Sequence, residues 1–202
     1  MNKKRGVFLF FIFSLLSFSQ DSEWELWSKM EYRYKINKKS FISLEPGSRY
    51  DLNPILFSKQ FIDLSSSRKI KKTLTLEVGL RLTKTPNQKL LGQRLYFSIL
   101  YKPDFRKYKF SFRSRLFSEK SVNDFTRQYF RNKIMLGYKQ SLLLNPYLEA
   151  EFLCGMNNLS ENKSRFGIGN QFNISKSVDL KIFFRLQNKD QKIIGLYISK
   201  KV

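Results

Sequence analysis

The sequence predicts an all-β protein, an antiparallel up-and-down transmembrane β-barrel of about 10–12 strands that follows an N-terminal signal peptide. Three observations favour this porin-like fold. Residues 1–19 have the layout of a secretory signal. The remaining chain consists of repeated segments in which apolar and polar residues alternate. No later stretch approaches the roughly 18 apolar residues of a transmembrane helix, which excludes a helical membrane protein.

The N-terminal segment has the three parts of a secretory signal peptide. Residues 3–5 are basic, residues 7–16 are apolar, and residues 17–19 offer small side chains for cleavage. An apolar helix of this length would rise only about 15 Å, against a bilayer core of about 30 Å, so it is too short for an anchor. No cysteine lies directly after the apolar stretch, which argues against a lipoprotein. We therefore expect a signal peptide at 1–19 and a single barrel domain at 20–202.

The charge of the chain is strongly basic. Lys and Arg number 38 against 16 Asp and Glu, a formal net charge of +22. A cytosolic protein of this composition would be expected to bind nucleic acid. An exported one is instead expected to meet outer-membrane lipid head groups, lipopolysaccharide phosphates or small anionic solutes, and no nucleic acid. The alternative is that the lysines reflect composition bias and solvated loops.

The rarest residue types exclude several kinds of chemistry. The chain has no histidine, so Ser-His, Cys-His and His-metal mechanisms cannot be built. Its single cysteine excludes a disulfide framework. We therefore expect no enzymatic activity, no cofactor and no metal site.

Alternation defines the expected strands in order along the chain. In residues 74–82 every second residue is Leu or Val, and those between them are Thr, Glu, Gly and Arg. Residues 107–116 and 178–187 follow the same rule, so each segment has one apolar and one charged face. Such segments are longer than most soluble strands and suit tilted membrane strands of about 9–11 residues. The expected strands are 24–35, 40–51, 57–67, 73–84, 91–102, 107–118, 127–139, 145–154, 163–174, 178–187 and 191–201.

The number of segments conflicts with the even strand number of bacterial barrels, so ten or twelve strands are expected. Segment 57–67 alternates poorly and is the weakest, and 24–35 could lie partly outside the barrel. Connections alternate in length, as in outer-membrane barrels with short periplasmic turns. The short ones are 36–39, 69–72, 103–106, 140–144 and 175–177, and the longer ones are 52–56, 85–90, 119–126 and 156–162, while the connection after 187 is short again.

Period two alone does not decide between a membrane barrel and a soluble lipocalin-like barrel that binds an apolar ligand. Strand length and number favour the membrane barrel, in which the apolar face meets lipid. Aromatic residues near segment ends fit the girdles of such barrels. They are Trp24, Tyr32, Tyr34, Tyr50, Phe57, Tyr101, Tyr108, Tyr138 and Phe172.

The charged face of each segment supplies the candidate residues that line the lumen. The basic ones are Lys29, Arg33, Arg49, Arg81, Arg94, Arg113, Arg115, Arg131, Lys133, Arg165, Lys181 and Arg185, and the acidic ones are Glu25, Glu31, Glu45, Glu77, Glu149, Glu151 and Asp179. In a barrel this narrow, such side chains should pair and largely fill the interior, which predicts a structural or accessory role. The alternative is a narrow pore that prefers anions, because basic residues are in excess.

Three further features receive structural interpretations. Glu149 and Glu151 share one face, and we interpret them as acceptors for arginines rather than as a catalytic pair. Cys154 is in phase with the apolar face. The sequence from Gly167 to Gly169 lies in a strand pattern and indicates a bulge or close packing, not a dinucleotide site.

The pattern as a whole resembles a known bacterial family, domain of unknown function 2490. The resemblance rests on Trp24, Trp27, residues 35–39, Arg49, the Arg-Ser-Arg of 113–115, Arg127, Arg131, residues 145–152 and residues 165–169. It implies a barrel in the outer membrane of a Bacteroidota-type Gram-negative bacterium, without an assigned activity. Outer-membrane barrels imply the barrel-assembly machinery as a partner during biogenesis. Many of them end in an aromatic residue, whereas this chain ends in Val202.

Overall fold

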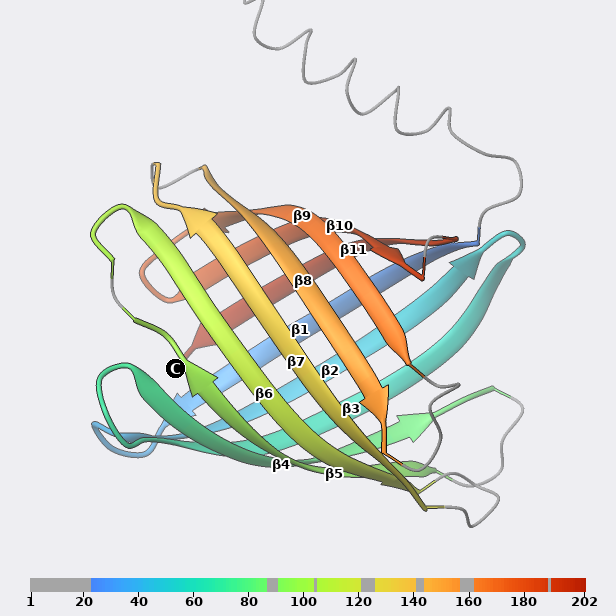
Figure 1. The fold of residues 1–202 in the computed structure, drawn as a ribbon, viewed down its shortest axis with the longest axis horizontal. Helices are drawn as coiled ribbons and strands as arrows, with labels where there is room; N and C mark the ends of the chain where they lie inside the picture. Colours follow the sequence, from blue (N-terminus) through green and yellow to red (C-terminus); the bar gives the residue numbers. More distant parts are fainter. Residues whose placement is uncertain are drawn as a thin grey trace, which may run out of the picture.

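A computed structural model describes residues 23–86, 91–103, 105–120, 126–140, 144–156, 162–188 and 190–202. They form a single closed barrel of eleven strands (Figure 1). In chain order the strands are β1 (Trp24–Lys35), β2 (Ser40–Leu52), β3 (Ile55–Lys69), β4 (Leu74–Lys84), β5 (Gly92–Tyr101), β6 (Tyr108–Lys120), β7 (Thr126–Tyr138), β8 (Asn145–Gly155), β9 (Lys163–Asn173), β10 (Val178–Gln187) and β11 (Gln191–Lys201). The predicted all-β barrel is confirmed, while the predicted signal peptide lies outside the described residues.

The barrel closes through a parallel pair. Each strand pairs antiparallel with the next, and β1 pairs parallel with β11 from Trp24↔Lys192 to Arg33↔Lys201. Eleven strands that reverse direction at every connection leave the first and last pointing the same way, so the closing pair must be parallel. The eleven strands lie within the predicted range of about 10–12, whereas the expected even number was wrong. The weakest predicted segment, 57–67, is a full member of the wall, the 15-residue strand β3.

The connections lie at two rims. At the short-turn rim β1 meets β2, β3 meets β4, β5 meets β6, β7 meets β8 and β9 meets β10, and the other consecutive strands meet at the opposite rim. The longer connection expected at 52–56 was wrong, because the β2–β3 ladder continues to Leu52↔Ile55 and leaves only Asn53 and Pro54 between the strands. The chain ends at the short-turn rim, where the Val202 amide donates to the Arg33 carbonyl at 2.9 Å.

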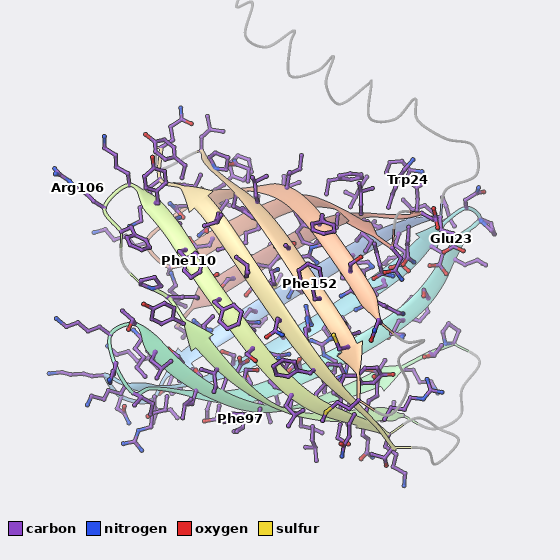
Figure 2. All side chains as sticks on the ribbon, in the orientation of Figure 1. Glu23, Trp24, Phe97, Arg106, Phe110 and Phe152 are labelled. Carbon is purple, nitrogen blue, oxygen red and sulfur yellow. The ribbon has the colours of Figure 1, made fainter. Side chains whose placement is uncertain are left out.

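The two faces of the wall differ in chemistry. Most of the exposed large apolar side chains, such as Leu95, Leu148 and Ile168, occupy the outward positions of the register. The buried polar and charged side chains, such as Ser98 and Glu151, occupy the inward positions. Figure 2 labels three outward phenylalanine rings, at positions 97, 110 and 152. This arrangement is the reverse of a lipocalin-like barrel, which buries its apolar face.

Outward aromatic residues gather toward the two rims. On the rim opposite the short turns, Trp24 lies 6.2 Å from Phe184 between ring centroids, and the Tyr50 and Phe57 rings are 5.7 Å apart. On the short-turn rim, the rings of Tyr108 and Tyr138 at the ends of β6 and β7 are 5.6 Å apart, again between centroids. Such belts suit the polar–apolar boundary of a bilayer. In the described part of the chain, no helix is long and apolar enough to span a membrane.

Candidate functional site

The candidate site is the inner wall of the barrel. The structure places all predicted lumen residues at inward positions of the register: Glu25, Lys29, Glu31, Arg33, Glu45, Arg49, Glu77, Arg81, Arg94, Arg113, Arg115, Arg131, Lys133, Glu149, Glu151, Arg165, Asp179, Lys181 and Arg185. It adds charged residues that the sequence analysis did not select, chiefly Lys59, Asp63 and Glu119. Inward basic residues outnumber inward acidic ones.

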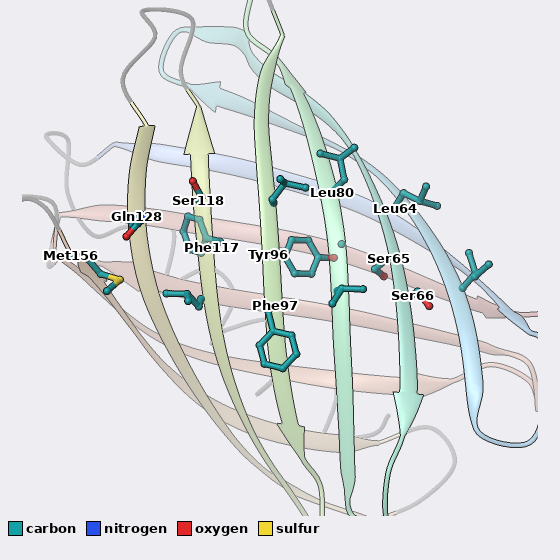
Figure 3. Close-up of a pocket in the computed structure, with 15 residues that line it drawn as sticks. Leu64, Ser65, Ser66, Leu80, Tyr96, Phe97, Phe117, Ser118, Gln128 and Met156 are labelled. Carbon is teal, nitrogen blue, oxygen red and sulfur yellow. The ribbon is translucent and has the colours of Figure 1, made fainter.

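Glycines on one strand make room for aromatic rings from the next. A Cβ added at Gly79 would collide with the Tyr96 ring, and one at Gly195 would collide with the Phe183 ring. These rings point inward and lie flat along the wall over the glycine backbone. Figure 3 shows Tyr96 lying against the neighbouring strand. The glycines at 167 and 169 likewise face inward side chains, so the predicted close packing holds there.

An apolar hollow of about 660 Å³ lies on this part of the wall, and Figure 3 shows the side chains that line it. It is lined mainly by outward side chains, including Leu64, Leu80, Leu95 and Phe97. Because the hollow lies on the outer apolar face, we do not include it in the candidate site.

One set of ion pairs centres on β8. Glu151 pairs with Arg131 and, at 2.5 Å, with Arg165. Glu149 pairs with Arg185 and, at 2.6 Å, with Lys133. Both carboxylates are almost fully buried, and two cations hold each of them, from β7 and β9 for Glu151 and from β7 and β10 for Glu149. They act as acceptors for basic side chains, which agrees with the sequence interpretation.

A second set lies on the wall formed by β2 to β6. Asp63 accepts hydrogen bonds from Arg81, at 2.6 Å, and from the Tyr96 hydroxyl, at 2.6 Å. Arg115 donates to the Ser98 hydroxyl at 2.8 Å and pairs with Glu77 at 3.4 Å. Asp63 holds two inner side chains at once, although the irregular alternation of its strand concealed it in the sequence.

Six arginines form what we term the arginine ring: Arg49, Arg81, Arg94, Arg131, Arg165 and Arg185. They come from β2, β4, β5, β7, β9 and β10. Arg49 interacts electrostatically with Arg81, Arg94 and Arg165. Arg131 interacts in the same way with Arg94 and Arg165, and Arg165 also with Arg185. The arginine ring therefore draws its side chains from six strands of the wall.

Aromatic faces support the arginine ring. Arg49 lies over Trp27, with its Cζ 3.9 Å from the ring centroid, and Arg81 lies over Phe61 at 4.2 Å. Arg94 stacks on Phe117 at 4.4 Å and Arg185 on Phe183 at 3.8 Å. Such contacts are favourable for guanidinium groups and fix the plane in which they lie.

Two inward cations outside the arginine ring differ from its members. In the described part of the chain, no ion pair joins Arg113 or Lys181 to a carboxylate. Glu45 and Glu77 attract Arg113 electrostatically. The Lys181 Nζ lies 5.5 Å from the centroid of the Tyr197 ring. The two cations also interact electrostatically with each other. They supply positive charge that no neighbouring acid neutralises directly.

Metal-binding clusters are absent from the described residues. The described residues hold no group of three or more Cys, Asp or Glu side chains arranged to bind a metal ion. Cys154 is exposed on the apolar outer face, as its phase predicted. The site is therefore a lining of fixed charges and aromatic rings.

The sequence analysis missed the inward aromatic residues. Trp27, Phe61, Tyr96, Phe117 and Phe183 support the arginine ring or other inner arginines. Their inward orientation could be inferred from the sequence, because each lies two positions along its strand from an inward charged residue. Alternation alone gave no reason to assign a large ring to the polar face. The glycines that accommodate Phe61, Tyr96 and Phe183 lie on neighbouring strands and are matched to these rings only by the register.

Comparison with known proteins gives one family and a similar structure. The profile of the family described as "Protein of unknown function (DUF2490)" matches residues 24–193. The solved structure titled "NanC porin structure in rhombohedral crystal form" is similar with a TM-score of 0.55 and 8% sequence identity, over 81% of this chain and 81% of that chain. At this identity the likeness concerns the fold alone. A comparison with curated proteins finds no match.

Proposed function

The chain belongs to the DUF2490 family of proteins of unknown function and has a porin-like fold, and from this we propose that it is an outer-membrane barrel whose lumen is a narrow, anion-preferring passage. The proposal has two parts, a location and a passage. They rest on different observations and are tested separately.

The location is supported by the exposed apolar face. A closed barrel leaves no unpaired strand edge, so it can satisfy its backbone in hydrocarbon. Outward leucines, isoleucines and phenylalanines surround the wall between two aromatic belts. A contiguous apolar band of this size would be a liability in water and is the expected surface in lipid. Outer-membrane lipid and lipopolysaccharide are the contacts that this part of the proposal implies.

The single observation that carries the passage is the direction of the ion pairs. Each ion pair between described residues joins positions on the same strand, on neighbouring strands or on strands two apart. The carboxylates are therefore neutralised along the wall and do not bridge the lumen. The cations left over, including Arg113 and Lys181, give the passage a positive lining, which favours anions.

A second candidate is the filled lumen with a structural role in the envelope. It is favoured by the burial of several inner side chains, among them Ser98, Arg115 and Phe183. A barrel of this size lies between those filled by side chains and those with a wide channel. Conductance distinguishes the two candidates.

The test is single-channel recording from purified protein in a planar lipid bilayer with a potassium chloride gradient. An anion-preferring passage should give small, discrete current steps, with a reversal potential close to the equilibrium potential of chloride. Arg113→Glu should shift the reversal potential toward that of potassium, and Arg113→Lys should leave it in place. Protein that inserts and shows the mobility shift of a folded barrel, yet gives no steps, would support the filled lumen. Steps that favour potassium would contradict the anion preference.

A further inference from the structure

We propose that the arginine ring is a binding site for one compact multivalent oxyanion of the phosphate class. The inference deepens the proposed function and rests on it for the route by which the anion reaches the lumen from water. It adds a binding site on the arginine ring to the positive lining of the passage, to which Arg113 and Lys181 also contribute.

Three members of the arginine ring approach the side chain of Trp27. Trp27 points inward from β1 and contacts Arg49 of β2 at 3.9 Å, measured from the guanidinium carbon to the indole centroid. The same indole lies 5.2 Å from Arg165 and 5.7 Å from Arg185, by the same measure. Arg165 and Arg49 are four strands apart around the wall. Guanidinium groups from distant strands therefore approach one aromatic ring inside the lumen.

The carboxylates near the ring do not use up its donors. Arg81 is paired with Asp63 and Arg94 with Glu119, while Arg131 and Arg165 share Glu151. Arg185 shares Glu149 with a lysine. Glu25 accepts hydrogen bonds from Trp27 and Gln191 instead of from an arginine. Arg81 also pairs with Glu45, which Lys29 shares. The six arginines together with Lys29 and Lys133 therefore face six carboxylates, which leaves an excess of positive charge around the ring.

Two donors of the ring have no acceptor. The Nε atoms of Arg49 and Arg94 are buried and make no hydrogen bond. No carboxylate in the described part of the chain forms an ion pair with Arg49, and the charge of Glu25 offsets only part of the repulsion from Arg81, Arg94 and Arg165. An unsatisfied buried donor and uncompensated repulsion are both costly. A bound oxyanion would remove both costs, because its oxygens accept from these groups and its charge offsets the repulsion.

The chemistry of the donors selects the kind of anion. Guanidinium groups match oxyanions with two parallel hydrogen bonds, which chloride cannot accept in that geometry. Aromatic stacking covers the faces of the guanidinium groups and leaves their N–H edges to face a ligand. Donors arriving from several strands suit a tetrahedral anion with several oxygens better than a planar carboxylate with two. Phosphate and sulfate share this shape and charge.

The test measures binding to protein folded in detergent, with inorganic phosphate as the probe. Isothermal titration calorimetry should give saturable binding near one anion per chain at an ionic strength held constant with potassium chloride. Arg49→Gln should weaken phosphate binding about tenfold or more, because it removes charge-assisted donors without leaving a carboxylate unpaired. The matched control is Lys181→Gln, which removes an unpaired inward cation outside the ring and should change the affinity less than about twofold.

Each outcome decides the inference. Saturable binding of phosphate, with no saturable binding when potassium chloride is titrated at equal ionic strength, supports the inference. Equal losses in the two variants, or no loss in Arg49→Gln, would overturn it and leave only general screening. If Arg49→Gln does not fold, Arg94→Lys, which keeps the charge and loses the fork, should weaken binding in the same direction, and unchanged affinity would refute the site. Failure of the passage is recognised separately, as phosphate binding without single-channel steps.

Discussion

Leu148→Arg tests directly whether the outer face meets lipid. Leu148 lies within β8 at an outward position and is 60% exposed. Its register partners, Leu136 and Ile168, are also outward and exposed. The substitution therefore places a charge in the middle of an apolar surface without disturbing any inner contact.

The expected magnitude depends on the solvent of this face. An exposed substitution on a water-soluble protein usually changes the free energy of unfolding by about 0.5 kcal/mol or less. On the lipid face of a barrel, arginine costs about 2–4 kcal/mol near the bilayer midplane and about 0–1 kcal/mol near the interface. Ile55→Arg is the matched control, because Ile55 is 77% exposed but begins β3 at the rim.

The assay is urea unfolding of protein inserted into phospholipid vesicles, with the folded fraction measured by the gel mobility of unboiled samples. We expect Leu148→Arg to lower the free energy of unfolding by about 2–4 kcal/mol and Ile55→Arg by about 0–1 kcal/mol. Equal midpoints for the wild type and Leu148→Arg would refute the assignment of the outer face to hydrocarbon.

Two further pairs of variants test the inner wall by the same unfolding assay. Glu151→Gln should cost about 3–5 kcal/mol, because this carboxylate is 4% exposed and holds two arginines, while Glu119→Gln, with a carboxylate 31% exposed and paired with one arginine, should cost about 0–1 kcal/mol. Similar losses in the two would show that the β8 ion pairs are not specially buried. Gly195→Val should cost about 1–3 kcal/mol, because a Cβ would overlap the Phe183 ring, whereas a Cβ at Gly92 has room and Gly92→Ala should change the free energy of unfolding by about 0.5 kcal/mol or less. Full stability of Gly195→Val would contradict the packing of ring on glycine.

The strands were predictable because their alternation is local. The predicted segments 24–35, 178–187 and 191–201 match β1, β10 and β11 residue for residue. Segment 57–67 looked irregular because the inward Phe61 and a run of serines blur its two faces. The ladder shift at Arg49 and Tyr50, opposite the start of β3, adds to this irregularity. Period two describes one strand at a time and carries no information on such shifts.

The closure of the barrel could not be predicted in this way. The pairing of the first strand with the last depends on the total number of strands and on their register. The rule that bacterial barrels have an even number of strands led to an expectation of ten or twelve. The inner wall shows the same limit. Period two predicted which faces carry Arg and Glu, but the contact of Phe183 with Gly195 joins two strands through the register. The arginine ring likewise exists only after strands from β2 to β10 are curved into one wall.

The central claim, a closed barrel inserted in the outer membrane, is tested most directly by envelope fractionation. Membranes are washed with carbonate, and the retained protein is compared on a gel with and without boiling. We predict retention in the outer-membrane fraction and a mobility shift on boiling, because a closed barrel resists detergent until it is heated. Release into the periplasmic fraction without detergent, as one mobility species, would contradict the account.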